Sequence, residues 1–135
     1  MPCARPFCVP VCDFEDLVCW RLSRELAREV FAVTAEGPAA KDFKFRDQIR
    51  DAAASAPRNI AEGFARFTPG DFARFLRYAV GSLAETRNHL LDGQDRGYFT
   101  PALASRLRNL TLAAERATKN LMLEKQRRAR GRRGT

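Results

Sequence analysis

The stretch from Gln48 to Gly63 constrains the fold more than any other part of this sequence. It reads QIRDAAASAPRNIAEG, a segment of helical composition that is rich in small residues and contains one proline. Alanine and serine allow another helix to approach closely, whereas Pro57 lacks a backbone donor and clashes with the carbonyl group four residues earlier. The segment therefore predicts a closely packed helix that is kinked or interrupted near Pro57.

The rest of the sequence predicts helices on both sides of this one. Apolar residues recur at helical spacing over residues 13–34, 43–67, 68–96 and 101–130, and the last two segments each open with a Thr-Pro pair. Threonine is a good N-cap, and proline is favoured in the first helical turn. Because no segment alternates like a strand, we predict an all-α protein: an antiparallel up-down four-helix bundle with a kinked second helix.

The first predicted helix carries more apolar surface than one bundle face needs. Two stripes, one containing Trp20 and the other Leu26, leave only a narrow polar stripe. This excess predicts a homo-oligomer. We expect Gly81 and Ser82 to pack closely against the alanine run, and Asn59 and Glu62 to form structural hydrogen bonds rather than bind a ligand. The residues predicted at the oligomer interface or the kink are Trp20, Ala53, Ser55, Pro57, Asn59 and Glu62.

Positive charge is concentrated at the C-terminal end. The chain of 135 residues has 24 Lys and Arg against 16 Asp and Glu, a net charge of +8, and six of the basic residues follow Glu124. We predict three parts: a disordered N-terminal segment at 1–12, a helical bundle at 13–123 and a flexible basic tail at 124–135. Such a tail is typical of contacts with polyanions. The predicted nucleic-acid contacts in the tail are Lys125, Arg127, Arg128, Arg130, Arg132 and Arg133.

A second basic cluster lies on the second and third predicted helices. Arg74 and Arg77 are the members that we predict to contact nucleic acid, and the neighbouring Tyr78 offers a ring on which a base could stack. Arg50, Arg58 and Arg66 accompany them. Acidic residues are interleaved, and for this reason an ordinary solvated face is the favoured explanation of this cluster.

The sequence gives no support for catalysis, a metal or a cofactor. The four cysteines all lie within the first nineteen residues without paired CxxC spacing, and the single histidine, His89, lies far from them. Glu85 and His89 do not make the set of carboxylates and histidines that a di-iron bundle requires. No phosphate-binding or serine-nucleophile motif occurs. We therefore predict a non-enzymatic protein, with no signal peptide or membrane span, that acts in the cytoplasm.

Three motifs in order resemble a known family. They are Phe14-x-x-Leu17-x-x-Trp20, the central Gln48 to Gly63 segment, and Phe72-x-x-Phe75-Leu76 followed by Gly97-Tyr98. The order resembles the four helix bundle protein family, first noticed as proteins encoded in intervening sequences of bacterial 23S ribosomal RNA genes. The resemblance implies a bacterial four-helix bundle that assembles as a pentamer. A related branch is the accessory protein of diversity-generating retroelements, a basic partner of a reverse transcriptase and its RNA.

Two functions follow as hypotheses. The first is a sequence-tolerant nucleic-acid-binding protein that uses the tail arginines, with RNA preferred on the resemblance alone. The alternative is a protein-interaction scaffold or accessory partner of a reverse transcriptase, whose basic tail has only an auxiliary role.

Overall fold

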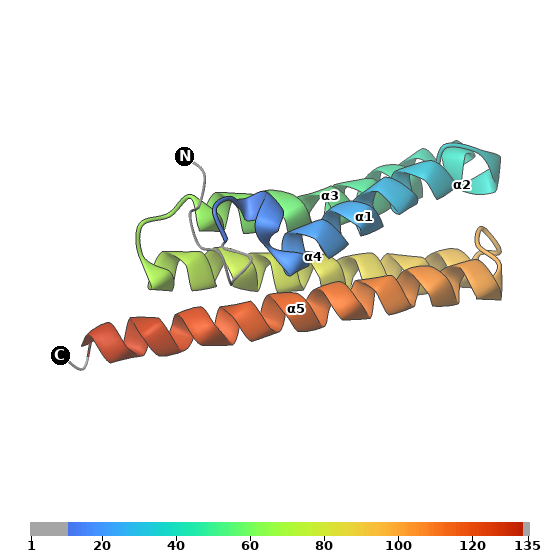
Figure 1. Cartoon of the computed structure of the whole chain (residues 1–135). Helices are drawn as coiled ribbons and strands as arrows, with labels where there is room; N and C mark the ends of the chain where they lie inside the picture. Colours follow the sequence, from blue (N-terminus) through green and yellow to red (C-terminus); the bar gives the residue numbers. More distant parts are fainter. Residues whose placement is uncertain (1–10, 134–135) are drawn as a thin grey trace.

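The chain is entirely helical over the range that the computed structural model describes, residues 11–133 (Figure 1). A single 3₁₀ turn, η1 (Phe14–Asp16), precedes five α helices, and no strand occurs in that range. The helices are α1 (Val18–Val33), α2 (Gly37–Lys41), α3 (Phe43–Phe64), α4 (Pro69–Asp95) and α5 (Pro101–Arg133). The predicted all-α class is confirmed.

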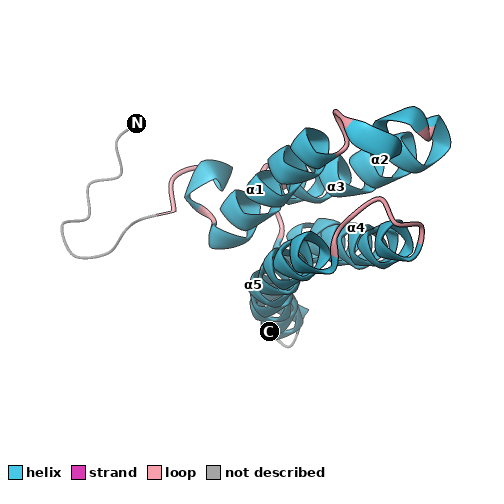
Figure 2. Cartoon of the chain, turned by 90° about the vertical axis from the view of Figure 1, so that its right-hand side faces the viewer, coloured by secondary structure: helices cyan, strands magenta, loops and turns pink. Residues whose placement is uncertain are grey.

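The four long helices lie side by side. α1 packs against α3 and α5, and α4 packs against the same two helices. Viewed from the end of the molecule, α1 and α3 form one layer, while α4 and α5 form the other (Figure 2). The C-terminal end of α5 reaches past the beginning of α4 (Figure 1). Each short connection reverses the chain, so α4 runs opposite to both α3 and α5.

Capping side chains explain where the helices begin. Thr68 accepts a hydrogen bond from the Asp71 amide at 3.1 Å, and Thr100 accepts one from the Leu103 amide at 3.2 Å. Both Thr-Pro pairs therefore start helices as predicted. Asp13 also caps, but it caps η1, and the chain is extended at Leu17 before α1 begins. The predicted first helix is thus two pieces, and α2 adds a short helix that the sequence reading missed.

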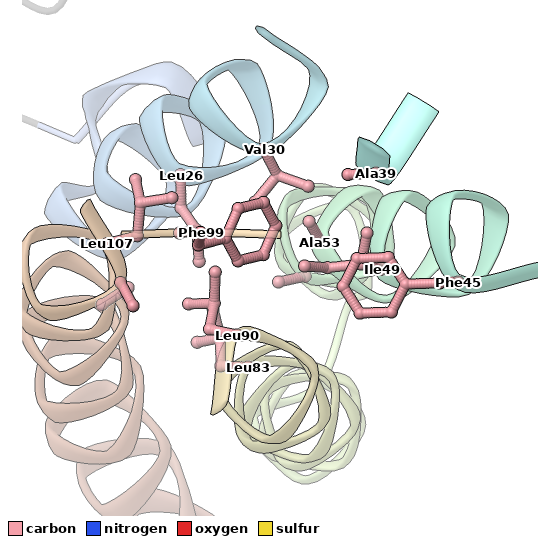
Figure 3. Close-up of a cluster of buried hydrophobic side chains, with 13 residues drawn as sticks. Leu26, Val30, Ala39, Phe45, Ile49, Ala53, Leu83, Leu90, Phe99 and Leu107 are labelled. Atoms are coloured by element: carbon pink, nitrogen blue, oxygen red, sulfur yellow. The ribbon is translucent and has the colours of Figure 1, made fainter. Parts of the chain in front are cut away.

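A central core lies where all four long helices meet (Figure 3). The ring of Phe99, from the turn between α4 and α5, projects into the space between the helices. Burying each large side chain contributes about 1.5–3 kcal/mol, so this cluster is a major source of stability. The cluster also contains Leu26 and Val30 of α1, Phe45, Ile49 and Ala53 of α3, Leu83 and Leu90 of α4, and Leu107 of α5.

A second core cluster lies towards the other end of the molecule. It joins Leu17 and Cys19 to Ile60 and to the first turns of α4, and Trp20 packs against its edge. The Trp20 ring meets Phe14 edge to face at 5.1 Å between centroids. Much of the predicted apolar excess around Trp20 is therefore used within one chain.

Pro57 does not interrupt its helix. α3 is continuous from Phe43 to Phe64 with Pro57 inside it, so the expected interruption is wrong. The alanines at 52, 53 and 56 are buried as expected. Because Ala53 has no exposed surface in the single chain, it is a core residue and not a surface available to another subunit.

The tight helix contact occurs at a different glycine from the one predicted. Gly81 is exposed, and a Cβ atom at that position would meet nothing within 4 Å. A Cβ atom on Gly63 would instead lie 2.8 Å from the Cβ of Phe75, and one on Gly93 would collide with the Phe99 ring. Gly63 and Gly93 are therefore the positions where α3 and α4 need the absence of a side chain.

The described part of the tail is helical, and its flexibility stays a prediction. α5 continues as one helix to Arg133, and Gly131 does not end it. The Lys125 side chain is only 17% exposed, and its ammonium lies 5.4 Å from the centroid of the Phe72 ring. Glu124 pairs with Arg128 one turn later at 3.2 Å, which supports the helix. Residues 134–135, like the predicted disordered residues 1–10, lie outside the described range.

Candidate nucleic-acid interface

A groove between the beginning of α4 and the end of α5 brings the two predicted basic clusters together. Its volume is about 330 Å³. Small residues shape its floor: Gly70 and Ala73 on α4 face Ala129 on α5, and a Cβ atom on Gly70 would lie 3.8 Å from that of Ala129. Polar and charged side chains complete the walls, namely Arg74, Arg77, Gln126 and Arg130. We call this feature the arginine groove.

The arginine groove has an excess of positive charge. Arg74 is partly neutralised, since its guanidinium lies 3.5 Å from the carboxylate of Asp71. Neither Arg77 nor Arg130 forms an ion pair with any residue in the described part of the chain. Guanidinium groups bind phosphate oxygens in a planar, bidentate geometry. Two cations without a protein partner, facing one groove from two helices, are suited to a polyanionic strand.

The remaining tail residues are arranged less uniformly than predicted. Lys125 is directed onto the Phe72 ring, and Arg128 is paired with Glu124. Arg127 is exposed, as is Arg132. The side chain of Arg133 lies outside the described residues. Of the six predicted tail contacts, Arg130 is the one that lines the arginine groove.

The other predicted arginines divide between two faces. Arg66 lies over the Phe75 ring at 4.5 Å, beside Arg74, which lies over the same ring at 5.4 Å. Arg50 instead turns towards α1, where its Nε donates to the Thr34 hydroxyl at 2.8 Å and its guanidinium covers Phe31 at 4.8 Å. Arg50 is therefore a structural residue that joins α3 to α1.

A polar seam crosses from α3 to α4. The Asn59 amide donates to the backbone oxygen and the hydroxyl of Ser55 at 2.9 and 3.0 Å. Ser82 donates to the same hydroxyl at 2.8 Å. Glu62 is exposed and pairs with Arg66 at 3.0 Å. Ser55 and Asn59 are half-buried structural groups, as expected, whereas Glu62 is not buried within this chain.

Histidine, cysteine and carboxylate side chains do not gather into a metal site in the described part of the chain. No cluster of three or more metal-binding side chains occurs there. His89 is largely buried, 14% exposed, and its Nε2 lies 3.5 Å from Glu85 without a hydrogen-bond partner in the described range. His89 is thus a largely buried histidine that is at most lightly paired with Glu85. Burial raises the pKa of the Cys19 thiol to about 11, which keeps it protonated and a poor nucleophile.

Sequence reasoning missed the walls of the arginine groove and one buried ion pair. Gly70, Gln126 and Ala129 have no distinctive pattern, and only the antiparallel pairing of α4 with α5 brings them to the arginines. Glu115, 5% exposed, forms an ion pair of 3.2 Å with Arg87 across the same two helices.

In the described range, no helix is both long and apolar enough to cross a membrane.

The fold and the arginine groove define a small, basic, all-helical protein without an evident reaction centre in its described part. The family model for the 23S rRNA-intervening sequence protein matches residues 15–121, and the chain belongs to that family. A crystal structure of a protein of unknown function from the S23 ribosomal protein family of Bacteroides thetaiotaomicron is similar, with a TM-score of 0.71 at 20% identity. The match covers 78% of this chain and 98% of the other, and it supports the fold alone. No curated protein matches the sequence.

Proposed function

We propose that this protein is a non-enzymatic, homo-oligomeric four-helix bundle that binds nucleic acid through the arginine groove and acts in the cytoplasm. The main observation in favour of this proposal is that Arg74 and Arg77 from α4 and Arg130 from α5 line one groove. RNA is the preferred ligand because the family is defined by an association with ribosomal RNA genes. The antiparallel up-down arrangement of the four long helices is part of the proposal.

Contacts with phosphates would allow Arg77 and Arg130 to contribute to the affinity for nucleic acid. Each neutralised phosphate releases condensed counterions, so the affinity falls steeply with salt. Three other arginines, Arg66, Arg96 and Arg106, are paired with carboxylates at 2.6–3.1 Å, so less of their charge is available to a phosphate. Sequence-tolerant binding is expected, because contacts to phosphates carry no direct base information.

Substitution of the groove arginines tests this proposal. The triple variant Arg74→Gln, Arg77→Gln, Arg130→Gln should lose affinity for a labelled RNA in fluorescence anisotropy. The slope of log affinity against log salt should shrink by about 2, or about 0.7 for each lost phosphate contact on a single strand. The matched control, Arg108→Gln, Arg116→Gln, Lys119→Gln, removes the same charge from exposed positions of α5 outside the groove. If both variants weaken binding equally, net charge and not the groove is responsible.

A second candidate function is that of a protein scaffold, self-assembled or joined to a reverse transcriptase. The observation that favours it is an apolar groove between α1 and α3, lined by Ala27, Phe31, Ala54 and Pro57 and flanked by Arg24 and Arg28. Phe31 is exposed despite its position beside the core. An apolar surface of this kind is typical of a subunit or partner contact.

Light scattering tests the assembly. The protein should be oligomeric at micromolar concentration, as the pentamer implied by the family resemblance requires. Phe31→Glu should dissociate it while leaving the helical circular dichroism unchanged, whereas Phe67→Glu, also at an exposed phenylalanine, should not. If the wild-type protein were monomeric at every concentration, both the proposed oligomer and the self-assembled scaffold would be contradicted.

A further inference from the structure

We propose that the protein selects single-stranded nucleic acid, with an unpaired base stacked on Tyr78 next to the arginine groove. This inference rests on the proposed function and adds the strandedness of the ligand. It comes from the aromatic residue that lies beside the groove arginines on the surface of α4.

The Tyr78 side chain is exposed to solvent and packs on a buried ring. Tyr78 is 48% exposed, and its ring packs edge to face against Phe75, with 5.6 Å between centroids and an angle of 83° between planes. Phe75 is itself buried. The Tyr78 hydroxyl donates no hydrogen bond to any group in the described range. Neither the core nor a polar partner therefore accounts for this tyrosine, whose ring surface is free to contact another flat group.

Two arginines of the same helix lie close to Tyr78 in the sequence. Arg77 directly precedes it, and Arg74 lies one helical turn before it on the same face of α4. Arg66 approaches from the end of α3 and shares the Phe75 ring with Arg74. Two nearby acids, Asp71 and Glu62, offset Arg74 and Arg66 by ion pairs at 3.5 and 3.0 Å. Because Arg74 lines the arginine groove and shares a helix face with Tyr78, a phosphate held in the groove would leave the attached nucleotide near the tyrosine.

The strandedness follows from what each nucleic-acid form exposes. In a duplex the faces of the bases are stacked inside, so only phosphates, sugars and groove edges are accessible. A single strand offers its base faces, and proteins that bind single strands combine a basic groove with aromatic platforms. The arginine groove with Tyr78 at its border has both elements. A duplex would use only the arginines.

The experiment compares one RNA strand with the same strand annealed to its complement. Wild-type protein should bind the single strand more tightly in fluorescence anisotropy. Tyr78→Leu should weaken single-strand binding by about tenfold, within the range measured for loss of one stacked base, and should leave duplex binding unchanged. Tyr78→Trp should retain binding. A strand carrying 2-aminopurine should lose fluorescence on binding to wild-type protein and not on binding to Tyr78→Leu.

The matched control is Phe43→Leu. Phe43 is also exposed and lies under an arginine, Arg46, at 4.9 Å, but it begins α3 at the end of the molecule away from the groove. It should not affect binding. If wild-type protein binds both forms equally and Tyr78→Leu has no effect while the groove variant still weakens binding, this inference fails and the proposed function stands. Loss of self-association in Tyr78→Leu would assign the ring to a subunit contact and overturn the inference. If wild-type protein binds neither form, both proposals fail.

Discussion

The phenol of Tyr98 donates a hydrogen bond of 2.6 Å to Oδ2 of Asp42, joining the turn after α4 to the first residue before α3. The same carboxylate accepts a hydrogen bond from Arg96 at 3.1 Å, and its other oxygen accepts the Phe45 amide at 3.2 Å and so caps α3. One side chain thereby holds two segments that are more than fifty residues apart. Helix capping and tertiary docking depend on the same carboxylate.

This arrangement predicts that the free energy of unfolding decreases at acidic pH. The Tyr98 hydrogen bond, followed by that of the Phe45 amide, lowers the pKa of Asp42 below the usual range of an aspartate. A lowered folded-state pKa contributes stability above the unfolded value, and that stability is lost as the pH falls through the folded value. Urea unfolding at about pH 3 and at neutral pH should therefore show a smaller difference for Asp42→Asn than for wild-type protein. Asp95→Asn, which removes a nearby exposed carboxylate, should keep the wild-type difference.

The same hydrogen bond acts in the opposite direction on Tyr98. Donation to Asp42 raises the pKa of the Tyr98 phenol above 10.0. The corresponding stability is present below the unfolded value and is lost as the pH rises through the folded one. Tyr98→Phe should therefore lower stability at neutral pH, because one hydrogen bond is lost, and should flatten the alkaline fall. Thermal melts across the alkaline range measure both effects.

Gly93→Ala should destabilise the protein although alanine is the better helix former. The new Cβ would collide with the Phe99 ring and come within 2.9 Å of Cζ of Phe45. Overpacking costs about 1–3 kcal/mol, which exceeds the helix propensity gain of about 1 kcal/mol or less. Gly81→Ala is the matched variant, since its Cβ meets nothing within 4 Å, and it should stabilise the protein. Urea midpoints that shift in the same direction for both variants would contradict this account.

The buried ion pair between Arg87 and Glu115 should show strong coupling. Arg87→Met leaves the Glu115 carboxylate, 5% exposed, without its cation and should cost about 3 kcal/mol. The lower part of the usual range applies because Arg87 is 36% exposed and water screens the charge. The double variant Arg87→Met, Glu115→Leu should recover most of that loss. A double-mutant cycle in urea gives the coupling, and an additive result would show that the pair does not matter.

Removing residues 125–135 should lower the thermal stability of the protein as well as its net charge. Lys125 covers the Phe72 ring, and Ala129 faces Gly70 at the start of α4. We expect the truncated chain to fold with a lower melting temperature, by a few degrees for a loss of about 1 kcal/mol. The groove triple variant should melt as wild type, because its side chains are exposed or at the groove wall. If the truncated and intact chains had the same melting temperature, residues 125–135 would not contribute to the packing of the bundle.

The sequence could predict the helices because their signals are local. The Thr-Pro starts and the spacing of apolar residues depend on neighbours within two turns, and both survive in the structure. The break after Asp16 was missed, since an acidic capping box looks alike at a 3₁₀ turn and at an α helix. Pro57 lies inside the continuous α3, so the interruption that we allowed for does not occur, and the kink stays a prediction.

The candidate site was predictable only in part. Arg74, Arg77 and Arg130 were identified by charge, but their meeting depends on how the 27 residues of α4 align with the 33 residues of α5. The helical end of α5 was missed, because a run of arginines and glycines gives no sign that Lys125 covers an aromatic ring. Gly81 and Gly93 look equivalent in the sequence, and only the neighbours brought by the fold distinguish them.

The walls of the arginine groove come from residues 70–77 and 126–130, which are remote in the chain. An unfolded chain has no such groove, so a ligand held there binds the native state and stabilises it by an amount that rises with the logarithm of the ligand concentration above Kd. The end of α5 is a helix terminus, where fraying and proteolysis concentrate, and the ligand would clamp that end against α4. Occupancy can thus be followed without any label on the nucleic acid, as slower trypsin cleavage after Arg127 and Arg130.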